Sequence, residues 1–223
     1  LGAPAYLLND GLTATLAELR LGAGRGARDL LLITLGTGIG CGVVLGGRLQ
    51  VGSRGHFGRA GHQILQVDGP VHCHCGRRGC WQSLAARDGV LARALAAAER
   101  FPESPLTRVM AGAAPDLREV TALSNAGEPA ARGVMEETGR LVGIGLANLI
   151  KTLAPERVVV GGGIAEGNRA LLEAAQRAVE EYGVLAWQRV PVVPAALGKD
   201  AGLLGATLLG DRETERQSDG VTA

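Results

Sequence analysis

The sequence is poor in aromatic residues and carries no excess charge of either sign. Aromatic side chains make up 3% of its 223 residues, whereas a β-sandwich relies on bulky inward-facing side chains between its sheets. Lys and Arg number 23 and Asp and Glu 22, so the chain has no basic field for non-specific nucleic-acid binding. The 35 glycines are instead typical of an α/β enzyme with many tight turns.

Long apolar runs and a targeting segment are also missing. No apolar run approaches the roughly 20 residues that a membrane-spanning helix needs, and residues 141–150 are interrupted by Asn148. Residues 1–10 have no basic segment and no small-residue cleavage site, so they do not form a signal peptide. We therefore expect a soluble, cytoplasmic protein without a membrane partner. Because the sequence starts at Leu1 rather than at methionine, we also expect its beginning to be missing or removed.

Apolar segments alternate in the order strand, turn, helix, strand of an α/β fold. Strands are expected over residues 29–35, 42–45, 48–51, 158–160 and 190–193, and helices over 13–21, 84–100, 128–150, 168–181 and 200–209. Small residues in the second half of the helix over 128–150 permit close packing in the core. Residues 101–115 contain three prolines and are expected to be rich in loops, and the polar residues 211–223 are expected to fray.

Three of the four cysteines are crowded into one short segment. Cys73, Cys75 and Cys80 form a C-x-C-G-x-x-G-C pattern, and His62 lies eleven positions upstream of Cys73. Three thiolates and one imidazole are the ligand set of a closed, structural zinc site. The glycines between the cysteines let the backbone turn tightly enough for the thiols to converge. The alternative is a set of reduced thiols beside a loop.

Two further histidines and one cysteine near this segment were weighed as ligands. His72 and His74 compete with His62, but they alternate with the cysteines, and alternate residues point away from each other. We therefore favour His62 as the fourth ligand. Cys41 is apart from the cluster and is expected to fill a small space in the core.

Two glycine-rich turns follow expected strands, at residues 36–40 and 161–163. Such turns expose backbone N–H groups that can hold a phosphate, and the Thr37 hydroxyl adds a further donor. Simple hairpin geometry explains the first turn equally well, because it is neither a dinucleotide fingerprint nor followed by a P-loop lysine. The pair of turns indicates a nucleotide lying across the sheet.

Asn9 and Asp10 lie between an apolar segment and the first expected helix. A carboxylate at such a junction can accept a proton from a substrate hydroxyl, with Asn9 orienting the same substrate. The competing interpretation, favoured by position alone, is that Asp10 caps the helix.

In combination, these motifs resemble those of the ROK family, which comprises bacterial glucokinases, other sugar kinases and sugar-responsive repressors. The similar segments are residues 9–10 (family motif N-D-x-N-A), 35–40 (L-G-T-G-x-G), 58–62 (G-E-x-G-H), 73–82 (C-x-C-G-x-x-G-C-x-E), 161–163 (G-G-G) and 195–202 (A-x-L-G-x-D-A-G). They follow the family's order along nearly the whole chain, which makes the set far more specific than any one motif.

The resemblance implies an α/β fold of the actin-like ATPase (ribonuclease H-like) type, a two-lobed sugar kinase with an incomplete N-terminal lobe. Residues 1–28 would be the remainder of that small lobe, residues 29–210 the large lobe with a zinc knuckle at 62–80, and residues 211–223 a polar tail. Asp10 would be the general base on a sugar hydroxyl, with ATP and Mg²⁺ as cosubstrate and cofactor and zinc as a structural ion. The other implied contacts are Asn9, Arg59, His62 and Gln82 with the sugar, Gly36, Thr37, Gly38 and Gly40 with phosphate, and Gly162 and Gly163 with adenosine.

Three departures from the family pattern bear on function. Nothing in the sequence resembles the family's D-x-G-G-T hairpin, which grips the ATP phosphates. Arg59 stands where the family has a glutamate, so a group that accepts hydrogen bonds is replaced by one that only donates them. Gln82 replaces a second glutamate and loses its charge. If both face the substrate, an altered or acidic sugar is as plausible as glucose, and so is a loss of activity, whereas Arg59 could also be a solvated loop residue.

The leading hypothesis is an ATP-dependent, glucokinase-like kinase of a hexose or amino sugar. A sugar-sensing repressor domain, whose DNA-binding helix-turn-helix would lie in a missing N-terminus, and a catalytically inactive relic are the alternatives. Without such a segment we expect no nucleic-acid partner. Dimers are common in the resembled family, so a homodimer is expected.

Overall fold

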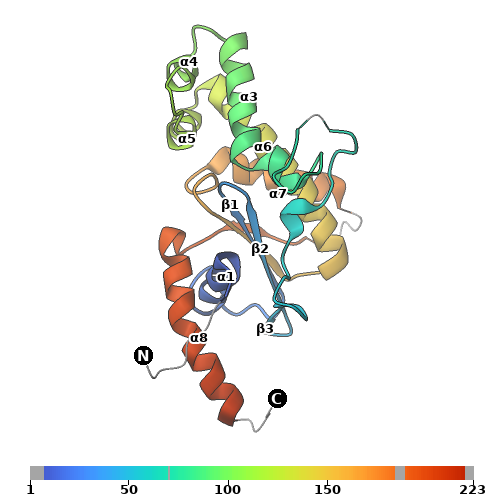
Figure 1. Ribbon diagram of the computed structural model, residues 1–223. Helices are drawn as coiled ribbons and strands as arrows, with labels where there is room; N and C mark the ends of the chain where they lie inside the picture. The colour runs from blue at the N-terminus through green and yellow to red at the C-terminus, as the bar shows by residue number, and fades with distance from the viewer. Residues whose placement is uncertain (1–7, 70, 184–188, 219–223) are drawn as a thin grey trace.

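A mixed five-stranded sheet in the order β3-β2-β1-β4-β5 forms the centre of the protein (Figure 1). The computed structural model describes residues 8–69, 71–183 and 189–218, so residues 1–7 of the expected small lobe and 219–223 of the expected tail lie outside the described residues. The strands are β1 (Leu30–Leu35), β2 (Ile39–Leu45), β3 (Arg48–Leu49), β4 (Arg157–Gly161) and β5 (Val192–Pro194). All five expected strands are therefore present.

Strand β1 pairs antiparallel with β2 and parallel with β4. Leu35 lies opposite Ile39 across a tight turn, which confirms the predicted hairpin with its glycine-rich corner. On the other side of β1, Thr34 lies opposite Gly161 at the end of β4. Because β1 and β4 run in the same direction, the two glycine-rich turns that follow them meet at one edge of the sheet.

Eight α-helices of the described residues pack around this sheet. They are α1 (Asp10–Leu21), α2 (Trp81–Ala85), α3 (Arg87–Arg100), α4 (Pro105–Met110), α5 (Leu117–Asn125), α6 (Pro129–Leu153), α7 (Arg169–Tyr182) and α8 (Ala201–Ser218). Two single 3₁₀ turns, η1 (Ala60–His62) and η2 (Gly198–Asp200), complete the set. Helices α1 and α8 lie together on one side of the sheet, and α3, α6 and α7 lie on the other (Figure 1).

The core is divided into two apolar clusters by the alternation of side chains along β1. Leu31 and Ile33 face the cluster that includes Trp81 of α2, whereas Leu30 and Leu32 face the cluster of α1 and α8. Because both faces of β1 are covered, its sequence is a nearly continuous apolar run rather than an alternating one.

Helix α6 is the central helix of the larger cluster, and its small residues explain its close packing. A Cβ added at Gly139 or Gly143 would collide with the backbone of α7, and one at Gly145 would collide with the indole ring of Trp81. The Trp81 indole N–H donates to the Leu141 carbonyl at 3.0 Å, so the ring is fixed against α6. The predicted close packing in the second half of this helix is confirmed.

Several expected boundaries were wrong, including the starts of α1, at Asp10 rather than residue 13, and of β2, at Ile39 rather than residue 42. The helix expected over 84–100 is interrupted at Ala86, whose extended backbone lets the Arg87 N–H donate to the Gly36 carbonyl at 3.1 Å. The segment 101–115 is not wholly loop, because Ser104 caps α4 and a proline occupies its first turn, where no N–H is needed. Helix α8 continues to Ser218 rather than ending near residue 209, into the segment expected to fray.

Among the described residues, no helix combines the length and the apolar character needed to cross a membrane.

Candidate active site

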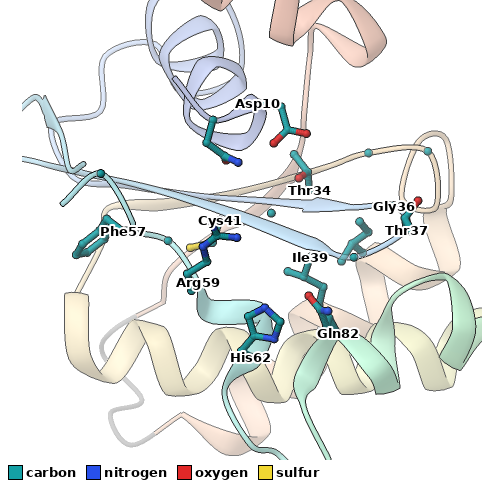
Figure 2. A pocket seen from close by; sticks show the side chains of 18 residues that line it. Asp10, Thr34, Gly36, Thr37, Ile39, Cys41, Phe57, Arg59, His62 and Gln82 are labelled. Carbon is teal, nitrogen blue, oxygen red and sulfur yellow. The ribbon is translucent and has the colours of Figure 1, made fainter. Parts of the chain in front are cut away.

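A cavity of about 360 Å³ opens at the edge of the sheet where β1 and β4 end (Figure 2). Its lining contains every residue that the sequence suggested for substrate or nucleotide: Asn9, Asp10, Gly36, Thr37, Gly38, Gly40, Arg59, His62, Gln82, Gly162 and Gly163. Segments far apart in the sequence thus converge on one space. The lining residues to which the sequence assigned no contact are Thr34, Leu35, Ile39, Cys41, Gly55, Phe57 and Gly58. Leu35, Ile39 and Gly58 lie inside the recognised motifs, and the other four lie within three positions of one.

Asp10 reaches the cavity from the first turn of α1. Asn9, not Asp10, is the N-cap: its Oδ1 accepts a hydrogen bond from the Gly11 N–H at 3.1 Å. The expectation that Asp10 caps the helix is therefore wrong, because Asn9 is the cap and Asp10 is the first residue of α1. One carboxylate oxygen of Asp10 accepts from the same N–H at 2.8 Å, and the other accepts nothing from the described part of the chain. The exposed carboxylate points into the cavity (Figure 2).

The two glycine-rich turns lie against each other in the lining of the same cavity as Asp10. Gly162 has a φ of +87°, and a Cβ there would collide with the backbone of Leu35, so the close approach of the turns requires glycine. The Ile164 N–H donates to the Leu35 carbonyl at 3.2 Å and joins the second turn to the end of β1. The result is a floor of bare backbone beside the Thr37 hydroxyl, which suits the close approach of phosphate oxygens.

A loop that folds back over β2 forms the opposite wall. Gly58 has a φ of +83° and sits on the Cys41 carbonyl, where a Cβ would collide. This contact holds the following residue, Arg59, at the start of η1 and at the rim of the cavity. Figure 2 shows the Arg59 side chain between Cys41 and His62.

His62, Cys73, Cys75 and Cys80 form a compact cluster directly behind this wall. Their candidate ligand atoms all lie within 4.8 Å of one another, and the cysteines are free thiols. The Cys73 Sγ is 3.6 Å from His62 Nδ1, and the Cys75 Sγ is 3.6 Å from the Cys80 Sγ. Those spacings are close to the edge of a tetrahedron with metal–sulfur bonds of about 2.3 Å. The residues present therefore fit a zinc ion.

His62, rather than His72 or His74, is the histidine that lies beside the thiols. His74 instead places its Nε2 3.2 Å from the Asp88 carboxylate on the surface. Burial raises the pKa of the Cys80 thiol to about 12, and the neighbouring Cys75 and Cys73 thiols raise it as well.

Gln82 connects the cluster to the cavity. Its Nε2 donates a hydrogen bond to the Cys73 Sγ at 3.3 Å, and its Oε1 lies beside Gly38, 3.2 Å from where a Cβ would be. His62 also belongs to both places, since it lines the cavity while its Nδ1 faces Cys73.

Cys41 is buried in the core, as expected, and burial raises its pKa to about 12.

A family model for the ROK family matches residues 1–213. The chain belongs to the ROK family. It is 32% identical to a glucokinase of Halalkalibacterium halodurans over 215 residues, covering 91% of this chain and 62% of the relative. It is also 32% identical to an N-acetylmannosamine kinase of Haemophilus influenzae, with 91% and 62% covered. The chain thus spans less than two thirds of the length of these relatives.

Solved structures of ROK proteins share the fold. A ROK glucokinase from Streptomyces griseus, in complex with glucose and AMPPNP, has a TM-score of 0.86 at 31% identity, covering 94% of this chain and 69% of that one. A ROK hexokinase from Thermus thermophilus has a TM-score of 0.80 at 40% identity, with 96% and 67% covered. A ROK transcriptional regulator, a homologue of the E. coli MLC protein, has a TM-score of 0.83 at 27% identity, with 93% and 52% covered. The prediction of an actin-like ATPase fold of the ROK sugar kinase type is confirmed.

Proposed function

We propose that this chain carries the active site of an ATP-dependent sugar kinase, which transfers a phosphoryl group to a hydroxyl of a hexose or amino sugar. The observation that carries the proposal is the convergence of Asp10 and both glycine-rich turns on one cavity of about 360 Å³. Phosphoryl transfer depends mainly on positioning and on stabilising charge, which a backbone-lined floor beside a carboxylate provides.

In this proposal Asp10 accepts the proton of the attacking sugar hydroxyl. Its first oxygen is held by the Gly11 N–H, which leaves the second to face the substrate. Asn9, Arg59, His62 and Gln82 hold the sugar. The backbone around Thr37 holds the transferring phosphate with Gly36, Gly38 and Gly40, and Gly162 and Gly163 lie near the adenosine. Mg·ATP, when bound, supplies the phosphoryl group and a cation that spreads its charge.

Zinc has a structural role in this proposal. His62, Cys73, Cys75 and Cys80 would hold the ion, which fixes the loop behind the cavity and leaves the His62 Nε2 as a donor.

The division into a small lobe, residues 1–28, and a large lobe, residues 29–210, also stays a proposal. We further place the protein in the cytoplasm, where ATP is available, as a homodimer without a nucleic-acid partner.

The test is phosphorylation of a panel of hexoses, amino sugars and sugar acids with Mg·ATP, followed as ADP release. Asp10→Asn keeps the size of the side chain and removes the base, so turnover should fall by about 10³-fold with sugar binding retained. The matched control is Asp68→Asn, an exposed position outside the cavity whose φ of +58° suits asparagine. Absence of turnover with every sugar, measured on the complete protein with any segment that precedes Leu1, would reject the kinase.

A sugar-sensing regulator is the second candidate, because a ROK transcriptional regulator shares the fold with a TM-score of 0.83. A sensor would bind sugar without releasing ADP, both before and after Asp10→Asn. The retained Asp10 carboxylate, with an oxygen directed into the cavity, favours the kinase.

A further inference from the structure

The lining of the cavity contains one acidic and one basic side chain, Asp10 and Arg59. Of the 18 residues that line it, Asp10 and Arg59 alone carry a charge at neutral pH apart from any charge on His62. If Asp10 takes a hydroxyl proton, as in the proposed function on which this inference rests, the carboxylate is committed to the reacting end of the substrate. Arg59 is then a positive charge with no counterpart in the wall of the site.

The Arg59 guanidinium has no internal partner to neutralise it. Among residues 8–69, 71–183 and 189–218, nothing forms a hydrogen bond or an ion pair with its side chain, which makes no capping bond although Arg59 is the N-cap residue of η1. The position of the residue is nevertheless fixed, because Gly58 is pressed onto the Cys41 carbonyl immediately before it. Arg59 is exposed, and its planar guanidinium extends from a fixed backbone at the rim, so it is suited to paired hydrogen bonds with a carboxylate or a phosphate.

Gln82 supplies no compensating charge for Arg59, because its amide side chain is neutral. Gln82 lines the same cavity, but its Nε2 donates to the Cys73 Sγ at 3.3 Å, which turns its Oε1 toward Gly38. This bond fixes the amide orientation, so Gln82 offers one acceptor oxygen and no charge. Arg59 is therefore left to pair with a group that the ligand brings.

We infer that the substrate is a sugar bearing an anionic group, a carboxylate or a phosphate, which pairs with Arg59 while a separate hydroxyl faces Asp10. Arg59 is the residue that sets this specificity. A charge-assisted pair of hydrogen bonds should favour the anionic sugar over its neutral counterpart by about tenfold or more.

The test measures binding of matched pairs to the chain by calorimetry. D-Gluconate is compared with D-glucitol for the carboxylate, and α-D-glucose 1-phosphate with methyl α-D-glucopyranoside for the phosphate; each of the four keeps a 6-hydroxyl. Arg59→Glu should reverse the preference, and Arg59→Gln, which removes charge without adding a new one, should abolish it. Arg54→Glu is the control, because Arg54 lies in the same loop outside the cavity lining.

The expected result is that the anionic member of at least one pair binds about tenfold more tightly, and that Arg59→Gln but not Arg54→Glu removes the difference. Equal or weaker binding of both anionic sugars overturns the inference, as does no binding of any of the four. A preference that survives Arg59→Gln also overturns it, since a sugar phosphate could instead occupy the glycine-rich floor. The kinase proposal fails separately: an intact anionic preference without ADP release rejects the kinase alone, whereas phosphorylation restricted to neutral sugars rejects this inference alone.

Discussion

The carboxylate of Glu18 accepts a hydrogen bond from the backbone N–H of Leu197 at 2.8 Å. The same carboxylate accepts from the N–H groups of Ala196 at 3.0 Å and Ala23 at 2.7 Å, and the side chain is fully buried. Glu18 belongs to α1, the helix that begins at Asp10, and residues 196–197 precede α8 and border Gly162. One buried carboxylate therefore ties the helix of the proposed base to a segment beside the second glycine-rich turn.

Replacing Glu18 should destabilise the protein strongly. Glu18→Ala leaves three backbone N–H groups without their acceptor in the interior, so we expect a loss of about 3 kcal/mol in the free energy of unfolding. Urea unfolding followed by circular dichroism measures the loss. Glu99→Ala, at an exposed position on α3, is the control and should change stability by less than about 0.5 kcal/mol. Equal stability of the two variants would show that the Glu18 bonds contribute nothing.

The sequence was sufficient for features that depend on short segments. The hairpin of β1 and β2 follows from two apolar runs around a glycine-rich corner, and the grouping of His62 with the cysteines follows from their spacing. The convergence of Asp10 with Thr37 and Gly162 was recognised through a family resemblance, because nothing local to those residues specifies that they meet.

Other features could not be read from the sequence because they depend on distant contacts. A glutamate among apolar residues was the only local signal at Glu18, and two of its three partners, Ala196 and Leu197, lie 178 and 179 residues away. No glycine or proline marks the break at Ala86 in the sequence. The break depends on the hydrogen bond from the Arg87 N–H to the Gly36 carbonyl. Proline at the start of α4 was read as a sign of loop, although proline also suits the first turn of a helix.

Gly145 and Gly133 of α6 should respond in opposite directions to the same substitution. A Cβ at Gly145 would enter the space of the buried Trp81 ring, so Gly145→Ala should cost about 2 kcal/mol through overpacking. A Cβ at Gly133 meets nothing within 4 Å, so Gly133→Ala should stabilise the protein by about 0.5–1 kcal/mol through helix propensity. Thermal unfolding of both variants checks the pair. A loss of stability in both, or in neither, would contradict the packing described for α6.

Glu128 should make the stability of α6 depend on pH. Burial by itself raises the pKa of this carboxyl, but hydrogen bonds from the Ala131 N–H, the Ser104 hydroxyl and the Ala130 N–H outweigh burial and hold the pKa below its ordinary value of 4.5. A carboxyl with a lowered pKa stabilises the fold above its unfolded pKa, and that contribution is lost as the pH falls through the folded value.

The corresponding variant is Glu128→Ala, which removes the cap at the start of α6 and should cost about 1 kcal/mol at pH 7. The difference in unfolding free energy from the unsubstituted chain should begin to shrink below pH 4.5 and become small once the folded carboxyl is protonated. Urea unfolding across pH 3–7 measures it. Glu103→Ala, at an exposed site near the same cap, should show no such change. A difference independent of pH would mean that the charge of Glu128 has no part in the cap.

The proposed metal centre can be tested at an exposed ligand, where loss of packing cannot explain the result. Cys75 is exposed, so Cys75→Ser should be nearly neutral unless its thiol binds an ion. With zinc bound, we expect about one ion per chain by elemental analysis, weaker retention in Cys75→Ser and a fall in melting temperature of about 5 °C or more. His74→Ala, next to it and 81% exposed, should change neither value, because the imidazole pairs with Asp88 rather than with the thiols.

A chelator should lower the melting temperature of the unsubstituted chain and of His74→Ala alike, and leave Cys75→Ser nearly unaffected. Zinc-free protein with the same melting temperature in all three chains would leave the cluster as reduced thiols.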